Sequence, residues 1–255
     1  TEKYTKLFKK FDVVKNLKTL KADLNNNFSI HLDNTYKVKD YNYSVIGKLE
    51  KSKFELLSPI KNSFVTEEIT NIYFSDFKMR TIFNPKDIKI SGEGKYSFDN
   101  LNFLNVNLEN NFNKNDLNLK LDFDYKNKIE LDFINYKKPK NLVSNILLVL
   151  EKKKNNINID ELNFNEGNNS IKIQGLNFNK KEFISFKKIE VRTTNNDFII
   201  ENDKKIHIKG TKFDATNLAK IFNKKSKENR FKKINSDIEI DFKNINVPMS
   251  EKLQN

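Results

Sequence analysis

Histidine is the first residue type to consider for metal binding or proton transfer, and this sequence has two, His31 and His207. A structural zinc site takes four ligands, mostly from Cys and His, and the sequence contains no Cys. Each histidine stands between two apolar residues in a segment that alternates apolar and polar side chains. We therefore interpret both as solvated strand residues and predict no metal site.

Carboxylates spaced two residues apart form a second pattern that could do chemistry. Such a pair can coordinate calcium or act as acid and base at one reaction centre. Here the spaced carboxylates alternate with apolar residues, and lysines on neighbouring strands are available as ion-pair partners. We interpret them as charged outer faces of strands, formed by Asp122, Asp124, Asp237, Glu239 and Asp241.

The segment Gly92-Glu93-Gly94 comes nearest to a phosphate-binding glycine turn. A dinucleotide-binding turn needs a third glycine, and Ser97 stands at that position. The segment lies inside an alternating pattern, where glycine more often allows a bulge or a strong twist. The sequence also lacks Gly-x-Ser-x-Gly, P-loop and His-Glu-x-x-His motifs. We therefore predict a non-catalytic protein without a cofactor.

The formal net charge is +13, from 47 Lys+Arg against 34 Asp+Glu. This balance favours anionic partners such as membrane headgroups, lipopolysaccharide or nucleic acid. Basic runs such as Lys152-Lys153-Lys154 and Lys224-Lys225 fall in predicted turns without interleaved aromatic residues, so we expect solvated loops and no nucleic-acid partner. About one residue in six is Asn and Trp is absent, so AT-rich codon usage explains the charge equally well.

An alternation of apolar and polar residues with period two runs almost from end to end. Successive side chains of a strand point to opposite faces, so each alternating segment predicts a strand with one apolar and one polar face. The clearest series are Leu20, Ala22, Leu24, Phe28, Ile30 and Leu32; Phe77, Met79 and Phe83; Ile88, Ile90, Tyr96 and Phe98; Leu117, Leu119, Leu121, Phe123 and Tyr125; Ile206 and Ile208; and Ile238, Ile240 and Phe242.

These segments, separated by short polar turns, predict a mainly β protein built as a long antiparallel meander. We expect a strand over 141–151, where the apolar run 142–150 also suits a buried helix, and a helical turn is an alternative within 67–74. Short helices are expected near the N-terminus, at 4–11, and at about 214–223. The other strands are expected at 17–32, 36–49, 54–57, 87–98, 103–112, 116–125, 128–136, 157–164, 168–178, 186–193, 197–201, 204–211 and 236–245.

The bulk composition agrees with sheets that have one solvated face. Hydrophobic residues make up 37% of the chain and the mean hydropathy is -0.71. The strands of a doubly wound parallel sheet read instead as unbroken apolar runs. No run of about 18 apolar residues is present, as a membrane-spanning helix would need. We expect residues 1–255 to be one continuous segment of a longer chain, because the pattern stops midway at Asn255.

One local motif, Gly210-x-x-Phe213-Asp214-Ala215, follows a predicted strand. Asp214 is well placed to cap the N-terminus of a short helix. A long one-sided meander closing on this motif resembles the AsmA-like proteins, and most nearly the YhdP-type and TamB-type members of Gram-negative bacteria. The Lys- and Asn-rich composition resembles an alphaproteobacterial version.

The resemblance implies a curled sheet that forms a long, open apolar groove, thought to carry phospholipid toward the outer membrane. It also implies an inner-membrane anchor outside this segment, a periplasmic location and no catalytic residues. Lysines at the rim of such a groove would favour anionic headgroups. The expected groove residues are Leu20, Leu24, Phe28, Ile30, Leu32, Phe77, Met79, Ile88, Ile90, Tyr96, Phe98, Leu117, Leu119, Leu121, Phe123, Ile206, Ile208, Ile238 and Ile240.

The same alternation fits a structural or adhesive β-sandwich or solenoid whose apolar faces seal against each other and bind no lipid. Long strands favour the groove, whereas short strands favour the sandwich. An outer-membrane protein would gather aromatic residues at the ends of its strands, whereas Phe and Tyr are scattered here.

Overall fold

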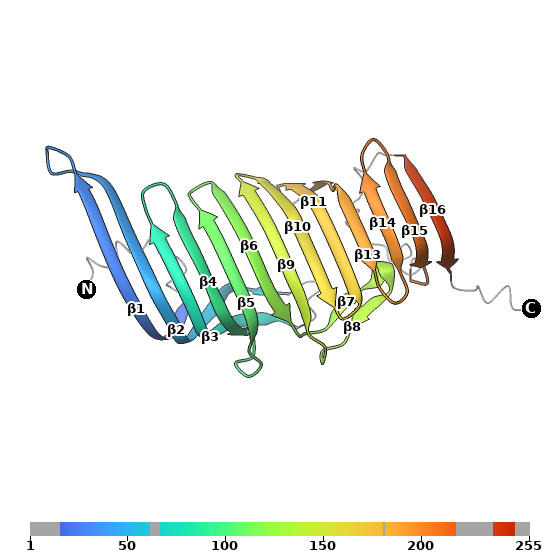
Figure 1. The fold of residues 1–255 in the computed structure, drawn as a ribbon, viewed down its shortest axis with the longest axis horizontal. Coiled ribbons are helices and arrows are strands. Elements are labelled where there is room, and N and C mark those ends of the chain that lie inside the picture. The colour runs from blue at the N-terminus through green and yellow to red at the C-terminus, as the bar shows by residue number, and fades with distance from the viewer. Residues whose placement is uncertain (1–15, 62–66, 181, 218–236, 248–255) are drawn as a thin grey trace, which may run out of the picture. The chain divides into compact units, whose positions relative to one another are not determined.

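The computed structural model describes residues 16–61, 67–180, 182–217 and 237–247. The described chain is mainly β, with a mixed 14-stranded sheet and a separate two-stranded sheet (Figure 1). The strands are β1 (Leu17–Leu32), β2 (Val38–Ile60), β3 (Ile69–Phe83), β4 (Ile88–Ser97), β5 (Leu104–Phe112), β6 (Asp116–Tyr125), β7 (Ile129–Leu131), β8 (Tyr136–Lys138), β9 (Ser144–Lys153), β10 (Asn156–Glu166), β11 (Asn169–Asn179), β12 (Glu182–Ser185), β13 (Lys188–Arg192), β14 (Asp197–Asn202), β15 (Ile206–Asp214) and β16 (Ile238–Asn246); a short 3-10 helix, η1, spans Asp132–Ile134.

The chain divides into two compact units between Lys114 and Asn115. In the N-terminal unit, β1 to β5 pair in chain order, and every pair is antiparallel. In the C-terminal unit, the order is β6, β9, β10, β11, β13, β14, β15 and β16, and β12 pairs with β11 beside this series. Neighbours in sequence are therefore mostly neighbours in space, as expected for a meander.

The alternating pattern predicted most strands closely, including the choice of a strand over a helix for β9. Two predicted segments, 36–49 and 54–57, form the single long strand β2, and the ambiguous stretch 67–74 opens β3. β1 and β2 span 16 and 23 residues, against a usual length of about 5–6.

Three expectations need correction or fall outside the description. The predicted strand 128–136 is the hairpin β7–β8 with η1 at its turn, because apolar residues change parity between Phe133 and Ile134 and Asn135 adopts a left-handed φ of 46°. The last pair, β15–β16, is parallel, so the meander is not antiparallel throughout. The expected helix at 4–11 and residues 218–223 of the expected second helix lie outside the described residues.

Paired irregularities bend the long strands of the N-terminal unit near their middles. The registers of β1–β2 and β3–β4 both shift where Glu50 and Asp76 lie opposite each other in β2–β3. Asp76 has a φ of 51°, and bulges of this kind bend a strand and increase its twist. Lys48 Nζ lies 2.7 Å from Asp76 Oδ1, and the hydrogen bond from Lys48 lowers the pKa of the Asp76 carboxyl.

The two glycines of Gly92-Glu93-Gly94 lie on β4 beside this bend, where Gly92 leaves room for the ring of Phe77 and Gly94 for its backbone. A Cβ at Gly92 would come 2.3 Å from the Phe77 ring, and a Cβ at Gly94 would come 2.5 Å from Phe77 Cα. Phe77 is consequently buried. The glycines allow close packing across a bulge, as the sequence predicted, and are not part of a phosphate-binding turn.

Replacing Gly94 by alanine therefore forces the backbone of β3 away from β4. We expect Gly94→Ala to lower the free energy of unfolding by about 1–3 kcal/mol, as overpacking does. The control is Ser91→Ala, at an exposed position of the same strand, with an expected change within about 0.5 kcal/mol. Urea unfolding followed by circular dichroism measures both, and equal midpoints would refute the packing role of Gly94.

Candidate functional site

The strand register gathers the apolar residues of the N-terminal unit on one side of its sheet. Residues directly opposite each other on paired strands point to the same face. Following the pairs Leu24↔Gly47↔Met79↔Gly92↔Leu108 defines this N-terminal apolar face. Its members are Leu20, Ala22, Leu24, Phe28, Ile30, Leu32, Val38, Tyr41, Tyr43, Val45, Leu49, Phe54, Ile72, Phe74, Phe77, Met79, Phe83, Ile88, Ile90, Tyr96, Leu104, Val106, Leu108 and Phe112.

The C-terminal unit has an apolar face of the same kind. The row Leu119↔Leu150↔Ile159↔Leu176 crosses β6, β9, β10 and β11. The C-terminal apolar face consists of Leu117, Leu119, Leu121, Phe123, Tyr125, Ile146, Leu148, Leu150, Ile157, Ile159, Leu162, Phe164, Ile171, Ile173, Leu176, Phe178, Ile189, Val191, Phe198, Ile200, Ile206, Ile208, Phe213, Ile238, Ile240 and Phe242.

The structure places the predicted groove residues on these two faces. Leu20 to Tyr96 of that set lie on the N-terminal apolar face, and Leu117 to Ile240 lie on the C-terminal apolar face. Phe98 follows the end of β4, where its ring centroid lies 5.1 Å from that of Tyr96. The prediction omitted the apolar residues of β2, β5, β9, β10, β11, β13 and β14, although their alternation was visible in the sequence.

No second large sheet covers either face among the described residues, in which the 14-stranded sheet is joined only by the β7–β8 pair. Leu20 is 49% exposed, and Ile90 and Leu119 are partly exposed. Large side chains near the middle of the N-terminal apolar face, such as Leu49 and Phe77, are nevertheless buried. Neighbouring side chains of the same face therefore shield one another, and the edge strands stay open to water.

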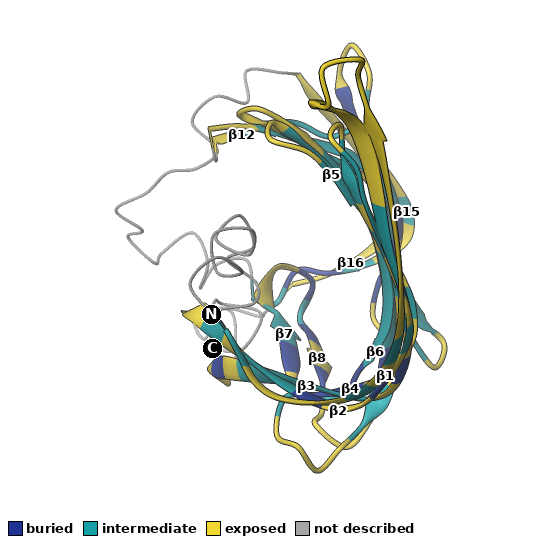
Figure 2. Ribbon diagram, turned by 90° about the vertical axis from the view of Figure 1, so that its left-hand side faces the viewer, coloured by how far each residue is buried: buried dark blue, intermediate teal, exposed yellow. Residues whose placement is uncertain are grey.

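The β7–β8 hairpin covers one end of the C-terminal apolar face. In Figure 2, β7 and β8 lie on the concave side of the curved strand β15, with β6 beside them. Tyr136 packs edge-on against Phe164 with ring centroids 5.7 Å apart, and its hydroxyl donates to Glu166 Oε2 at 2.9 Å. Burial first, and then this hydrogen bond, raise the pKa of Tyr136.

A buried lysine fixes the base of this hairpin. Lys138 is fully buried, and its ammonium donates to the carbonyl oxygens of Lys126, Asn127 and Pro139 at 2.9–3.2 Å. It also lies 5.8 Å from the ring centroid of Tyr125. Burial lowers the pKa of Lys138. These contacts join the two ends of the segment between β6 and β9 that contains the hairpin.

A polar network joins the turn of the hairpin to the end of β15. Asn196 is fully buried; its Nδ2 donates to Ile134 O at 2.7 Å, and its Oδ1 accepts from Asp214 N at 2.9 Å. Asn135 Nδ2 donates to Asp214 Oδ2 at 2.9 Å. Of the motif residues, Asp214 ends β15 and binds Asn135, and Phe213 lies 6.0 Å from Phe133 between ring centroids. Gly210 lies inside β15, and Ala215 follows the strand and donates its backbone N–H to Asn246 O.

Asp214 caps a turn in the described residues. Its Oδ1 accepts from the backbone N of Thr216 at 3.1 Å and from the Thr216 hydroxyl at 2.6 Å. Burial alone would raise the pKa of the Asp214 carboxyl, but hydrogen bonds from Thr216 and Asn135 outweigh it and lower the pKa.

The other residues singled out for chemistry lie apart from these faces. His31 is exposed on β1, and His207 Nδ1 lies 3.2 Å from Glu239 Oε2 on β16. Asp122 Oδ1 accepts from Asn145 Nδ2 at 2.7 Å. The described residues hold no cluster of three or more His, Cys, Asp or Glu that could bind a metal ion. They also include no helix long and apolar enough to cross a membrane.

Compared with known proteins, the chain matches no protein-family model, no curated protein and no solved structure. The AsmA-like resemblance, which rests on pattern and one short motif, therefore stays a prediction.

The buried amide of Asn196 gives a direct test of how the hairpin is held. Asn196→Ala leaves the Ile134 carbonyl and the Asp214 N–H without these partners, so we expect a loss of about 2–4 kcal/mol in stability. Hydrogen exchange should accelerate in β7 and β8 more than in β10. The control is Asn195→Ala, at an exposed position of the same turn, and equal exchange in both variants would contradict this role.

The lowered pKa of Asp214 predicts an acid-dependent loss of stability. Its folded pKa lies below the unfolded value of about 3.9, so its contribution is complete above that pH and is lost as pH falls through the folded pKa. We expect Asp214→Asn to flatten the dependence of stability on pH below about 4. Asp203→Asn, at an exposed turn, is the control and should keep the wild-type slope in urea titrations.

Proposed function

We propose that the N-terminal and C-terminal apolar faces bind the acyl chains of phospholipid without catalysis. One observation carries this proposal: an apolar face extends over successive strands in each unit, and no second large sheet covers it in the described residues. Each methylene removed from water contributes about 0.8 kcal/mol. A surface of Leu, Ile and Phe can supply that gain to an acyl chain in any register, because apolar contacts are not directional.

The AsmA-like resemblance supports a larger role for this segment. On that basis we propose a periplasmic protein, anchored to the inner membrane by a segment outside this sequence, that supports phospholipid transport between the two membranes. The alternative, a structural or adhesive protein without a lipid ligand, requires the apolar faces to be sealed. A sandwich would seal them with a second large sheet, and the second sheet among the described residues is only the β7–β8 pair, which covers one end of the C-terminal apolar face.

The sheet offers apolar residues on opposite faces as matched probe positions. In the N-terminal unit, Ile30 lies on the apolar face and is 43% exposed, whereas Ile46 lies on the polar face and is 47% exposed. In the C-terminal unit, the adjacent residues Leu147 and Leu148 point to opposite faces, and Leu148 pairs with Leu121 on the apolar one. Each pair compares the two faces at similar residue type and exposure.

A photo-crosslinking amino acid at each of these four positions tests the proposal. We expect lipid adducts, identified by mass spectrometry after irradiation in the presence of phospholipid, at positions 30 and 148. Yields at 46 and 147 should be lower by on the order of tenfold, since a lipid tail gains nothing from a polar surface. Equal yields on both faces, or no adduct at any position, would refute acyl-chain binding.

A further inference from the structure

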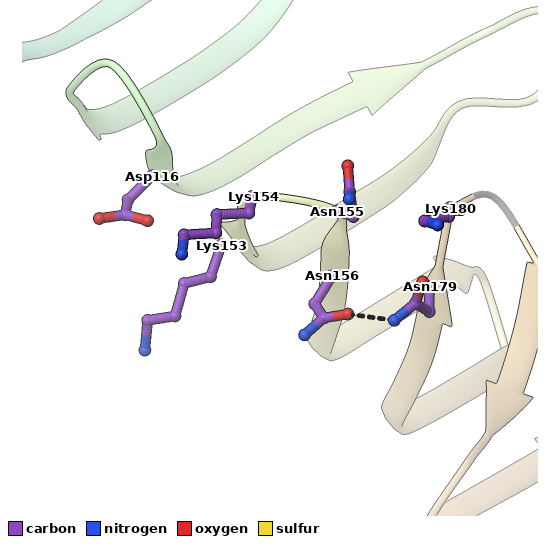
Figure 3. A pocket seen from close by; sticks show the side chains of 7 residues that line it. All are labelled: Asp116, Lys153, Lys154, Asn155, Asn156, Asn179 and Lys180. Carbon is purple, nitrogen blue, oxygen red and sulfur yellow. Dashed lines mark hydrogen bonds between the residues drawn. The ribbon is translucent and has the colours of Figure 1, made fainter.

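A pocket lined by charged and amide residues lies at the strand ends of the C-terminal unit. It has a volume of about 430 Å³ and is formed by the β9–β10 turn, the end of β11 and the start of β6 (Figure 3). Asn179 Nδ2 donates to Asn156 Oδ1 at 2.8 Å across one side of it. Three lysines, Lys153, Lys154 and Lys180, line it together with one carboxylate, Asp116.

The charges around this pocket favour an anion. Lys153 is partly neutralised, since its ammonium lies 2.7 Å from Glu151 Oε1, and Asp116 and Asp160 attract it more weakly. Lys154 and Lys180 form no ion pair with any residue that the structure describes. The pocket therefore holds two turn ammonium groups whose charge no described carboxylate offsets through a direct contact.

The backbone at these two turns is a second, independent observation. Lys154 and Lys180 have φ values of 53° and 47°, in the left-handed region that glycine and asparagine adopt most easily. The backbone N–H of Lys154 donates to Asn115 O, and that of Lys180 donates to Asn155 O, both at 3.0 Å. Both turns thus place a lysine at a backbone position with positive φ, where glycine or asparagine is less strained. Asparagine makes up about one residue in six of this chain, yet neither turn has it at this position.

The pocket begins one residue beyond the C-terminal apolar face. Leu117, Ile157 and Phe178 lie in one row of that face, and the next residue on each strand toward its end lines the pocket. The lining side chains of the strands point to the polar face, whereas Lys154 and Lys180 stand at the turns between the two faces. A bound tail that reaches this row has its polar end close to these turn lysines.

We propose that the turn lysines Lys154 and Lys180 bind the phosphate group of a phospholipid whose acyl chains lie on the C-terminal apolar face, and that Lys153 adds positive charge to the pocket from the polar side. This inference rests on the proposed function and adds to it a preference for phosphate-bearing, anionic lipids over neutral ones. Lysine suits this role because its ammonium binds phosphate as a mobile point charge and tolerates different headgroup positions.

The test uses the full chain and two fluorescent lipids with identical acyl chains, phosphatidylglycerol and diacylglycerol, which lacks phosphate. The pocket variant is Lys153→Gln/Lys154→Gln/Lys180→Gln. The matched control, Lys204→Gln/Lys205→Gln/Lys209→Gln, removes the same charge from exposed lysines on and beside the β14–β15 turn. We expect the pocket variant to bind phosphatidylglycerol on the order of tenfold more weakly, with diacylglycerol binding unchanged and the control within about twofold of wild type.

Other outcomes separate the two proposals. If wild type binds neither lipid, the proposed function fails and this inference fails with it. If it binds both lipids and the pocket variant keeps wild-type affinity for phosphatidylglycerol, or the control loses as much affinity, the pocket assignment is overturned while acyl binding stands. Calorimetry with inorganic phosphate completes the test: lysine-dependent phosphate binding without any lysine effect on phosphatidylglycerol would assign the pocket to a free anion.

Discussion

An apolar sheet face must be kept from water, and in each unit of this protein one sheet layer meets that constraint largely by itself. In the N-terminal unit the strands bend at paired bulges, and side chains of the apolar face pack against one another, as Phe74 and Phe77 do with ring centroids 5.0 Å apart. The result is graded burial: Leu49 and Phe77 are buried, while Leu20 and Ile240 on edge strands remain open. A second layer would have completed the burial, and its absence from the described residues is what makes these faces candidates for a ligand.

The C-terminal unit adds a local solution at one end of its face. The β7–β8 hairpin packs on Phe164 and Phe213 and is held by polar side chains that are themselves buried, Lys138 and Asn196. Every contact described for these two groups is a hydrogen bond or a ring contact, so burial of their polar atoms is compensated. At one end, the hairpin covers the C-terminal apolar face and is held there by specific polar contacts. Over the rest of this face, apolar side chains shield one another without directional contacts.

The period-two pattern was enough to predict most strands and the face on which each predicted groove residue lies, because parity decides which side chains share a face. The predicted groove set nevertheless left out the apolar residues of β2, β5, β9, β10, β11, β13 and β14. The pattern failed to predict the hairpin turn at Phe133 and Ile134, where the apolar residues change parity. A turn and a bulge both produce such a change of parity, so the sequence does not distinguish them. The direction of β16 could not be predicted either, because alternation is identical in parallel and antiparallel pairs. The lysine pocket was missed for a different reason: its residues come from three turns and strand ends, and Lys152-Lys153-Lys154 was interpreted as a solvated loop.

The chain-order pairing has a consequence for how such a molecule assembles. Most strands pair with their immediate predecessor, so each new hairpin forms at a small cost in loop-closure entropy, and folding can begin at any hairpin and spread to its neighbours. The parallel step from β15 to β16 departs from this scheme, because a parallel pair cannot be joined by a tight hairpin turn and needs a longer crossover connection. Strand pairing is thus local over most of the sheet, whereas the last strand, β16, joins through a contact between residues farther apart in the sequence.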